Sequence, residues 1–373
     1  MKLLLAADIF PPESGGPATY VVNLANSFLK EEVCIVSLNP SSDESLVNCP
    51  LYRVTSPSKL RRYVEYFWLL WKQSKNVEVV YAMGPVNAGL PAFLVSFFRR
   101  KKFFVKVVGD YAWEQGTQRF GVKENIDDFQ TKRYGFRVEM LRAVERFVTR
   151  HAHGVIVPSF YLKKIVSGWG VQEKKIHTVY NSVNFVNSTT ANEPSEEQRI
   201  VSVGRLVPWK GFAALIDVFD ELKQEFPHAR LVIIGDGPDH SFLNEKIKEK
   251  NLEEKVEMLG NLSHEKTLSF IQSADMFVLN SGYEGMSHVI LEAMFLDRPV
   301  LASNVGGNPE VVKEYPQGDL FEYNNKEELK QKIKHMLVTP RPNSAEYSQT
   351  KKEFLEQFRF EHMIQKTKNI LGQ

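Results

Sequence analysis

The chain has 373 residues, of which 43% are hydrophobic and 25% are charged, and its formal net charge is +2. This length exceeds the needs of one small core and suits two domains of ordinary globular composition. Its only two cysteines, Cys34 and Cys49, exclude a disulfide framework and fit a reducing compartment, and no apolar run is long enough to span a bilayer.

The small net charge conceals an asymmetry between the two halves. Residues 1–184 contain 25 basic and 16 acidic residues, which gives +9, whereas the remaining residues carry −7. Unequal solvation explains such a difference, and so does an anionic partner facing the first half. The composition leaves both interpretations open.

The first half alternates apolar strands with amphipathic helices. Residues 2–7 are predicted to form a buried strand rather than a signal peptide, because Asp8 and two prolines follow at once. A loop then ends at Gly15-Gly16, and Pro17 opens a helix that runs to about residue 30. Further strands are predicted at 33–38, 77–82, 103–108 and 154–157, with long helices near 59–75, 86–98 and 132–151.

The same alternation returns in the second half. Strands are predicted at 199–203, 230–234, 255–259, 276–279 and 300–302, with helices near 211–226, 239–250, 264–273, 287–296, 344–358 and 360–371. The pattern predicts an α/β fold of two Rossmann-like, doubly wound parallel-sheet domains that face a central cleft. Residues 184–198 form the predicted linker between a domain of residues 1–184 and one of residues 185–359.

A basic loop follows the first predicted strand of the second domain. Arg205 offers a planar fork for phosphate oxygens and Lys210 a mobile charge, while Gly204 and Gly211 let the backbone approach a ligand. Together the two cations suit a diphosphate and the negative charge that builds as it departs. A surface pair that merely flanks a turn is the alternative.

Two carboxylates bracket a loop that turns into a helix. Ser287 is predicted to cap that helix, whose free N–H groups suit a phosphate. Glu284 precedes the helix and suits sugar hydroxyls, whereas Glu292 lies one turn inside and suits a ribose diol. An acid in this apolar segment is expected to lack a protein partner, which favours a ligand. A helix-start acid with an incidental loop acid is the alternative.

A third polar segment follows the strand predicted at 103–108. Asp110 is placed at a strand end, Tyr111 and Trp113 suit stacking on a sugar face, and Glu114 is a second acid. A capping Asp followed by a packed aromatic loop is the alternative. No metal site is predicted, because no acidic or histidine ligands have suitable spacing.

Aromatic and basic residues alternate on the helix predicted at 59–75. Leu60, Phe67 and Trp71 lie among Arg61 and Arg62, and a run of four basic residues at 99–102 follows the next helix. Such a stripe belongs to a core or to an interface with anionic lipid. No nucleic-acid-binding module is recognisable.

The ordered motifs resemble those of glycosyltransferase family 4, whose retaining enzymes have the GT-B fold. They include Gly15-Gly16, Val203-Gly-Arg-Leu-Val-Pro-Trp-Lys-Gly, Leu231-Val-Ile-Ile-Gly-Asp-Gly, the segment from Glu284 to Glu292, and Val305-Gly-Gly-Asn-Pro-Glu. The resemblance implies metal-free transfer with retention at the anomeric carbon. It also implies that the last helix, about 360–373, packs back on the first domain.

The resemblance implies a role for each matching residue. Arg205 and Lys210 correspond to the diphosphate pair, Glu292 to the ribose ligand and Glu284 to the sugar contact. The expected catalytic residues are Asp110, Glu284, Arg205 and Lys210, and Tyr111, Trp113 and Glu114 are expected on the acceptor side. The other expected donor-binding residues are Gly16, Leu259, Gly260, Met286, Ser287 and His288.

The chain departs from the family pattern at two places. Met286-Ser287-His288 replaces the usual Phe-Gly, so that His288 itself could contact phosphate or sugar. Gly109-Asp110 stands where many members have a histidine, which leaves either Asp110 or Glu114 as the acid.

The predicted function is transfer of a hexose-type sugar from a UDP- or GDP-linked donor to a hydroxyl of a glycan or lipid-linked acceptor, in the synthesis of a cell-envelope glycan, polysaccharide or glycolipid. No cofactor and no nucleic acid are expected. A cytoplasmic location is expected, with peripheral contact to an anionic membrane as a further expectation. A nucleotide-sugar epimerase and a non-catalytic nucleotide-sugar binding protein are the alternatives.

Overall fold

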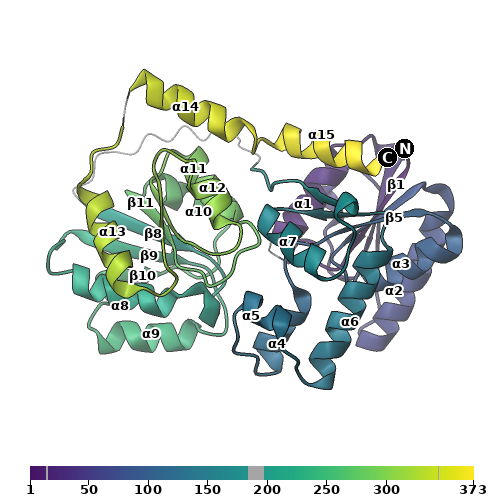
Figure 1. Ribbon diagram of the computed structural model, residues 1–373, viewed down its shortest axis with the longest axis horizontal. Helices are drawn as coiled ribbons and strands as arrows, with labels where there is room; N and C mark the ends of the chain where they lie inside the picture. The colour runs from purple at the N-terminus through teal and green to yellow at the C-terminus, as the bar shows by residue number, and fades with distance from the viewer. Residues whose placement is uncertain (14–15, 184–196, 343) are drawn as a thin grey trace. The chain divides into compact units, whose positions relative to one another are not determined.

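The computed structural model describes residues 1–13, 16–183, 197–342 and 344–373, which form two compact units. Unit 1 comprises Met1–Tyr180 with Glu361–Gln373, and unit 2 comprises Asn181–Phe360 (Figure 1). The predicted boundary at 184/185 and most of the predicted linker fall on residues 184–196, which lie outside the described residues.

Unit 1 is built on a seven-stranded parallel sheet in the order β3-β2-β1-β4-β5-β6-β7. Its inner strands are apolar runs because helices cover both of their faces. The strands are β1 (Leu3–Ala7), β2 (Val33–Ser37), β3 (Leu51–Arg53), β4 (Val79–Met83), β5 (Lys102–Lys106), β6 (Gly154–Val157) and β7 (Ile176–Thr178).

Eight α-helices of the described residues belong to unit 1, and one of them comes from the end of the chain. They are α1 (Gly16–Asn26), α2 (Lys59–Gln73), α3 (Gly89–Arg99), α4 (Tyr111–Arg119), α5 (Ile126–Thr131), α6 (Phe136–His151), α7 (Phe160–Gly168) and α15 (Phe360–Leu371). Helices α2, α3 and α6 pack on one face of the sheet. Helix α15 meets α1, where Lys368 binds the carbonyl of Ser27 and Thr367 lies 3.4 Å from the Tyr20 hydroxyl.

Unit 2 repeats the architecture with a six-stranded parallel sheet in the order β10-β9-β8-β11-β12-β13. Helices α8, α9 and α13 cover one face, and α10, α11 and α12 cover the other (Figure 1). The strands are β8 (Gln198–Val203), β9 (Ala229–Ile234), β10 (Val256–Met258), β11 (Met276–Leu279), β12 (Val300–Ser303) and β13 (Gly318–Phe321). The helices are α8 (Phe212–Leu222), α9 (His240–Glu249), α10 (His264–Gln272), α11 (His288–Phe295), α12 (Asn308–Val312), α13 (Lys326–Val338) and α14 (Ala345–Glu356).

The predicted pair of doubly wound parallel sheets is therefore confirmed. In each sheet the first strands along the chain are added on one side of a central strand and the later strands on its other side. The point where the strand order changes direction, the strand reversal, lies between β1 and β4 in unit 1 and between β8 and β11 in unit 2. Loops at the carboxyl ends of such strands diverge and leave room for a ligand. Within the described part of the chain, each helix is either too short or too polar to cross a lipid bilayer, and both cysteines are free thiols.

Candidate functional site

The loop after β8 is held close to the loop after β11 by backbone contacts. Gly211, with a φ of +63°, ends the short 3-10 helix η5 (Pro208–Lys210) and precedes α8. A Cβ atom there would lie 2.1 Å from the Asn280 carbonyl oxygen, so only glycine fits. Gly282 N–H also donates to the Trp209 carbonyl at 2.6 Å. These contacts fix Lys210 beside the second loop.

Lys210 and Glu284 form an ion pair at this point. The lysine Nζ lies 2.5 Å from the Glu284 Oε1, and the two side chains keep 18% and 12% of their exposure. The residues are 74 positions apart in sequence, and both were predicted to contact one ligand. A partly buried ammonium needs a negative partner. Glu284 provides it, so that a phosphate near Lys210 would share the ammonium with this carboxylate.

Arg205 lies in the same loop, but unlike Lys210 it is not paired with a carboxylate in the part of the chain that the structure describes. Its side chain is exposed, and its guanidinium makes no ion pair or hydrogen bond with the described residues, whereas its backbone carbonyl accepts from Val207 N–H at 2.9 Å. A guanidinium in this state keeps its planar fork available for an anion. The loop therefore offers one paired and one available cation.

A second set of backbone contacts holds the Glu284 loop against the loop after β12. The Glu284 carbonyl accepts a 2.9 Å hydrogen bond from Gly307 N–H. A Cβ atom on Gly306, whose φ is +57°, would lie 2.0 Å from that same oxygen. Gly306 is thus required for the loop after β11 to approach, and the carboxylate is positioned by three strand-end loops.

The start of α11 matches its prediction. Ser287 is the N-cap residue, and its hydroxyl oxygen accepts from Ile290 N–H at 3.4 Å. The preceding Met286 is buried, and its carbonyl accepts from the Asn181 side-chain amide at 3.0 Å. His288 opens the helix and is partly buried. The first turn of α11 consequently presents backbone N–H groups next to Glu284 in sequence.

Glu292 has a protein partner that the sequence did not reveal. The His264 Nε2, at the first position of α10, lies 2.8 Å from the Glu292 Oε1. The expectation that Glu292 would lack a partner is wrong, so that the cost of burying it no longer favours a ligand by itself. Its hydrogen bond raises the pKa of His264, whose side chain remains 62% exposed.

Leu259 and Gly260 belong to the loop after β10. Leu259 N–H donates to the Ile233 carbonyl at 3.0 Å, and the Gly260 carbonyl accepts from Gly235 N–H at 2.8 Å. Gly260 has a φ of +64°, and a Cβ atom added to it would meet nothing within 4 Å. The main chain here is anchored to β9 on one side and open on the other.

Asp110 lies in unit 1 and is only 1% exposed. It caps α4: its Oδ1 accepts from Trp113 N–H at 2.8 Å, and its Oδ2 accepts from the Gln130 amide at 2.7 Å. Burial raises the pKa of Asp110, and burial together with the Asp110 charge raises the pKa of Glu145 well above its usual value. These contacts match the capping alternative.

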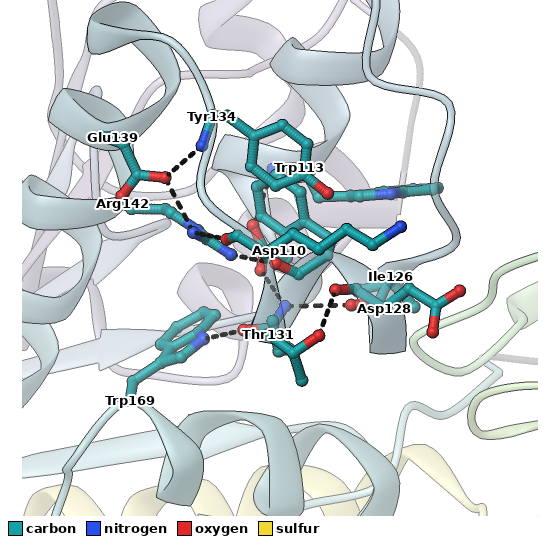
Figure 2. Close-up of polar contacts among 12 residues, drawn as sticks. Asp110, Trp113, Ile126, Asp128, Thr131, Tyr134, Glu139, Arg142 and Trp169 are labelled. Carbon is teal, nitrogen blue, oxygen red and sulfur yellow. Dashed lines mark hydrogen bonds and ion pairs between the residues drawn. The ribbon is translucent and has the colours of Figure 1, made fainter.

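The surroundings of Asp110 form a continuous polar network (Figure 2). Arg142 donates to the Lys132 carbonyl at 2.8 Å and to Glu139 at 2.9 Å, and its guanidinium lies 4.1 Å from the centre of the Phe129 ring. Trp113 is 3% exposed and donates its indole N–H to the Glu124 carbonyl at 2.9 Å. Its ring is therefore packed inside unit 1. Tyr111 and Glu114 are partly exposed.

Two surface hollows of unit 2, of about 340 and 650 Å³, lie away from these residues. The first is lined by the amino-terminal halves of β9 and β10, and the second by the ends of α8 and α9. Ligands of open α/β sheets bind at the opposite, carboxyl edge. The strand-end loops therefore remain the candidate ligand site, rather than either hollow. No group of three or more potential metal ligands occurs among the described residues.

Comparison with known proteins identifies the family. Residues 14–186 match the model of "Glycosyltransferase Family 4", and residues 186–354 match that of "Glycosyl transferases group 1". The chain belongs to glycosyltransferase family 4. Its two sheets are those of the GT-B fold, and the function it supports is glycosyl transfer.

Relatives of this glycosyltransferase come from distant organisms. An uncharacterized glycosyltransferase of Methanocaldococcus jannaschii is 25% identical, covering 99% of this chain and 97% of its own. One component of the phosphatidylinositol N-acetylglucosaminyltransferase of Arabidopsis thaliana is 25% identical, covering 84% of this chain and 69% of its own. Among solved structures, Anabaena HepE in complex with UDP-glucose has a TM-score of 0.79 and 19% identity, covering 100% of this chain and 99% of HepE. At that identity, HepE shows a shared fold.

Proposed function

We propose that this glycosyltransferase moves a hexose-type sugar from a nucleoside-diphosphate sugar to an acceptor hydroxyl, with retention at the anomeric carbon. The observation that carries the proposal is the meeting of Lys210 and Glu284, with Arg205 in the same loop, at the strand reversal of the unit 2 sheet. Retention is what membership of family 4 implies. The complexes of HepE with UDP and UDP-glucose support a nucleotide-linked donor, UDP- or GDP-linked here.

Arg205 and Lys210 would hold the donor diphosphate. As the bond between the anomeric carbon and the diphosphate oxygen breaks, its electron pair passes to that oxygen, and the two cations stabilise the new charge. The acceptor oxygen attacks from the side on which the diphosphate leaves. The nearest base for its proton is then an oxygen of the departing diphosphate, so no buried carboxylate has to accept it.

The other unit 2 residues would orient the donor. Glu284 would accept hydrogen bonds from the transferred sugar, and Glu292 from the ribose, in exchange for its contact with His264. Met286, Ser287 and His288 would bring the first N–H groups of α11 to a phosphate. The open main chain at Leu259 and Gly260 would lie against the base, and Gly16, at the start of α1, beside the diphosphate.

On the acceptor side we assign Asp110 a positioning role, because both of its carboxylate oxygens are engaged in capping α4. Tyr111 and Glu114 remain candidates for acceptor contact. No metal ion is required, since the arginine and the lysine supply the positive charge that a bound cation would otherwise provide.

We infer further that the acceptor is lipid-linked and that unit 1 contacts an anionic membrane. Leu60, Val64 and Trp68 recur every four residues on α2 and are 78%, 54% and 60% exposed. Basic residues flank them at 59, 61 and 62, an arrangement typical of interfacial helices. A relative from Campylobacter jejuni, 30% identical over 47% of this chain and 48% of its own, is named for transfer to a diphospho-undecaprenol-linked glycan.

A thermal-shift panel of nucleoside diphosphates and nucleotide-sugars, with and without EDTA, tests the donor proposal. Selective stabilisation by one donor, unchanged by EDTA, is the expected result. Donor consumption without an acceptor-linked product would favour an epimerase, and stabilisation without turnover would favour a binding protein. A shift that EDTA abolishes would contradict metal-free binding.

A further inference from the structure

Four polar residues meet at the carboxyl edge of the unit 1 sheet. Asn87 donates its amide N–H to the Asp8 Oδ2 at 3.3 Å and to the Tyr111 hydroxyl at 3.1 Å. The Tyr63 hydroxyl donates to the Asn87 Oδ1 at 2.9 Å. Asn87 thus joins a carboxylate and two phenols into one hydrogen-bonded cluster, which we call the Asp8 cluster.

The Asp8 cluster lies at the strand reversal of unit 1. Asp8 follows β1, Asn87 lies between β4 and α3, and Tyr111 opens α4 after β5. Strands β1 and β4 are paired neighbours and flank the reversal. This is the position at which open α/β sheets bind their ligands, and in unit 2 the equivalent position holds Lys210 and Glu284.

The cluster has one acid and no matching cation. Among the described residues no ion pair of Asp8 is recorded, and its hydrogen bond to Asn87 is with a neutral amide. All four residues retain accessible surface. Burial raises the pKa of Asp8 to about 6, since the carboxyl group is removed from solvent, and the charge of Glu13 adds to the rise. Polar groups kept open at a strand edge in this way are available to a ligand.

The chemistry of the cluster selects the kind of ligand. A carboxylate beside two phenols repels an anion such as a phosphate. A metal ion would need further acidic or histidine ligands, and no group of three exists among the described residues. Hydroxyl groups fit, because each can donate to the carboxylate, and each can donate to or accept from a phenol hydroxyl.

We propose that Asp8, Asn87, Tyr63 and Tyr111 form a subsite that binds vicinal hydroxyl groups of a neutral sugar, the terminal unit of the acceptor. This assignment of an acceptor class rests on the proposed transferase function. Asp8 accepts a hydrogen bond from one hydroxyl of that sugar, and the Tyr63 and Tyr111 hydroxyls contact the next, while Asn87, whose amide is engaged with all three, holds them in place. A carboxylate held this way orients the sugar, and a hydrogen bond to it is stronger than one between neutral groups.

Binding of a panel of simple methyl glycosides, the α- and β-anomers of glucoside, galactoside, mannoside and N-acetylglucosaminide, tests the subsite in the full chain. Saturation-transfer NMR and titration would measure the affinities. At least one glycoside should bind the wild type with a weak, roughly millimolar Kd. Asp8→Asn, which keeps the shape of the side chain, should weaken it by about tenfold, the usual effect of losing a charge-assisted hydrogen bond.

Two further variants keep the test sharp if Asp8→Asn folds poorly. Tyr63→Phe removes only a hydroxyl and should weaken the same glycoside by about threefold. Glu31→Gln is the control. Glu31 lies in the exposed 3-10 helix η1 (Lys30–Glu32) that precedes β2, so this variant removes one negative charge from the amino edge of the sheet and should leave the glycoside affinity unchanged. Absence of glycoside binding by the wild type would overturn the proposal. So would wild-type affinity in both Asp8→Asn and Tyr63→Phe.

Nucleotide affinity, measured on the same samples, separates this inference from the proposed function. The variants of the Asp8 cluster should bind UDP or GDP as the wild type does. Nucleotide binding without glycoside binding would refute the subsite and leave the donor site standing. Glycoside binding without nucleotide binding would refute the donor proposal and with it the acceptor role, while the subsite would remain.

Discussion

At the scale of single residues, the contact between Lys210 and Glu284 determines how the donor charge is met. Lys210→Ala should lower the rate of donor consumption by about 10²–10³-fold, because a preorganised cation at the departing diphosphate is lost. The matched control is Lys246→Ala. Lys246 forms a similar partly exposed pair with Asp217 at 2.6 Å, but between α8 and α9. Equal rates in both variants would refute the role of Lys210.

His264 offers a test of the Glu292 site that needs no substrate. The hydrogen bond to Glu292 raises the pKa of His264, so its charged form is favoured in the folded protein. The stabilisation is present at low pH and is lost as the pH rises through the raised pKa. An NMR titration of the imidazole should give a pKa above about 6.5 in the wild type.

Glu292→Gln should return the His264 pKa towards that ordinary value, since the anionic partner is gone. The solvent-exposed His228 or His335 would report any general change in the same spectra. An unchanged His264 pKa in the variant would show that the contact is absent in solution, and Glu292 would then be free to bind a ribose without competition.

At the scale of elements, Asp110 connects the start of α4 to α5. Asp110→Ala should lower the free energy of unfolding by about 1–3 kcal/mol, because it removes an N-cap and one of the two acceptors of the Gln130 amide, the Ile126 carbonyl being the other. Urea unfolding would measure this. Asn125→Ala, at the exposed N-cap of α5, should cost about 1 kcal/mol or less. Loss of turnover at full stability would instead indicate a direct catalytic role for Asp110.

The exposed face of α2 gives a second prediction at this scale. Wild-type protein should co-sediment with anionic vesicles at low salt and less at high salt, as apolar insertion and screened charge both contribute. The triple variant Leu60→Ser, Val64→Ser, Trp68→Ser should remain in the supernatant. Phe242→Ser, which removes a 55% exposed ring from unit 2, is the control. No sedimentation of the wild type would refute the membrane contact.

At the scale of the whole molecule, the sequence predicts those features of the structure that depend on residues close together in the chain. Both sheets were predictable because their inner strands are unbroken apolar runs. The short strands β3, β7 and β13 lack such runs. Ser287 was recognisable as a cap because capping depends on its near neighbours.

Contacts between distant segments were not predictable in this way. Lys210 and Glu284 are 74 residues apart, and His264 and Glu292 are 28 apart. Only the order of the strands brings them together. The burial of Asp110 depends likewise on Gln130 of α5, a helix that the sequence pattern did not reveal. The chemistry of the site could be predicted from the residue types, whereas the hydrogen-bond and ion-pair partners of these residues could be identified only from the structure.

If Arg205 and Lys210 bind a donor diphosphate, the affinity of the protein for nucleotides should depend on both residues. Calorimetric titration would compare a nucleoside with its diphosphate, for uridine and guanosine, against the wild type and the Arg205→Ala, Lys210→Ala double variant. For one base, the wild type should prefer the diphosphate by at least about 100-fold, as two charge-assisted contacts predict. The double variant should lose most of that preference. A preference that survives in the double variant, or that is missing from the wild type, would show that Arg205 and Lys210 do not bind the diphosphate.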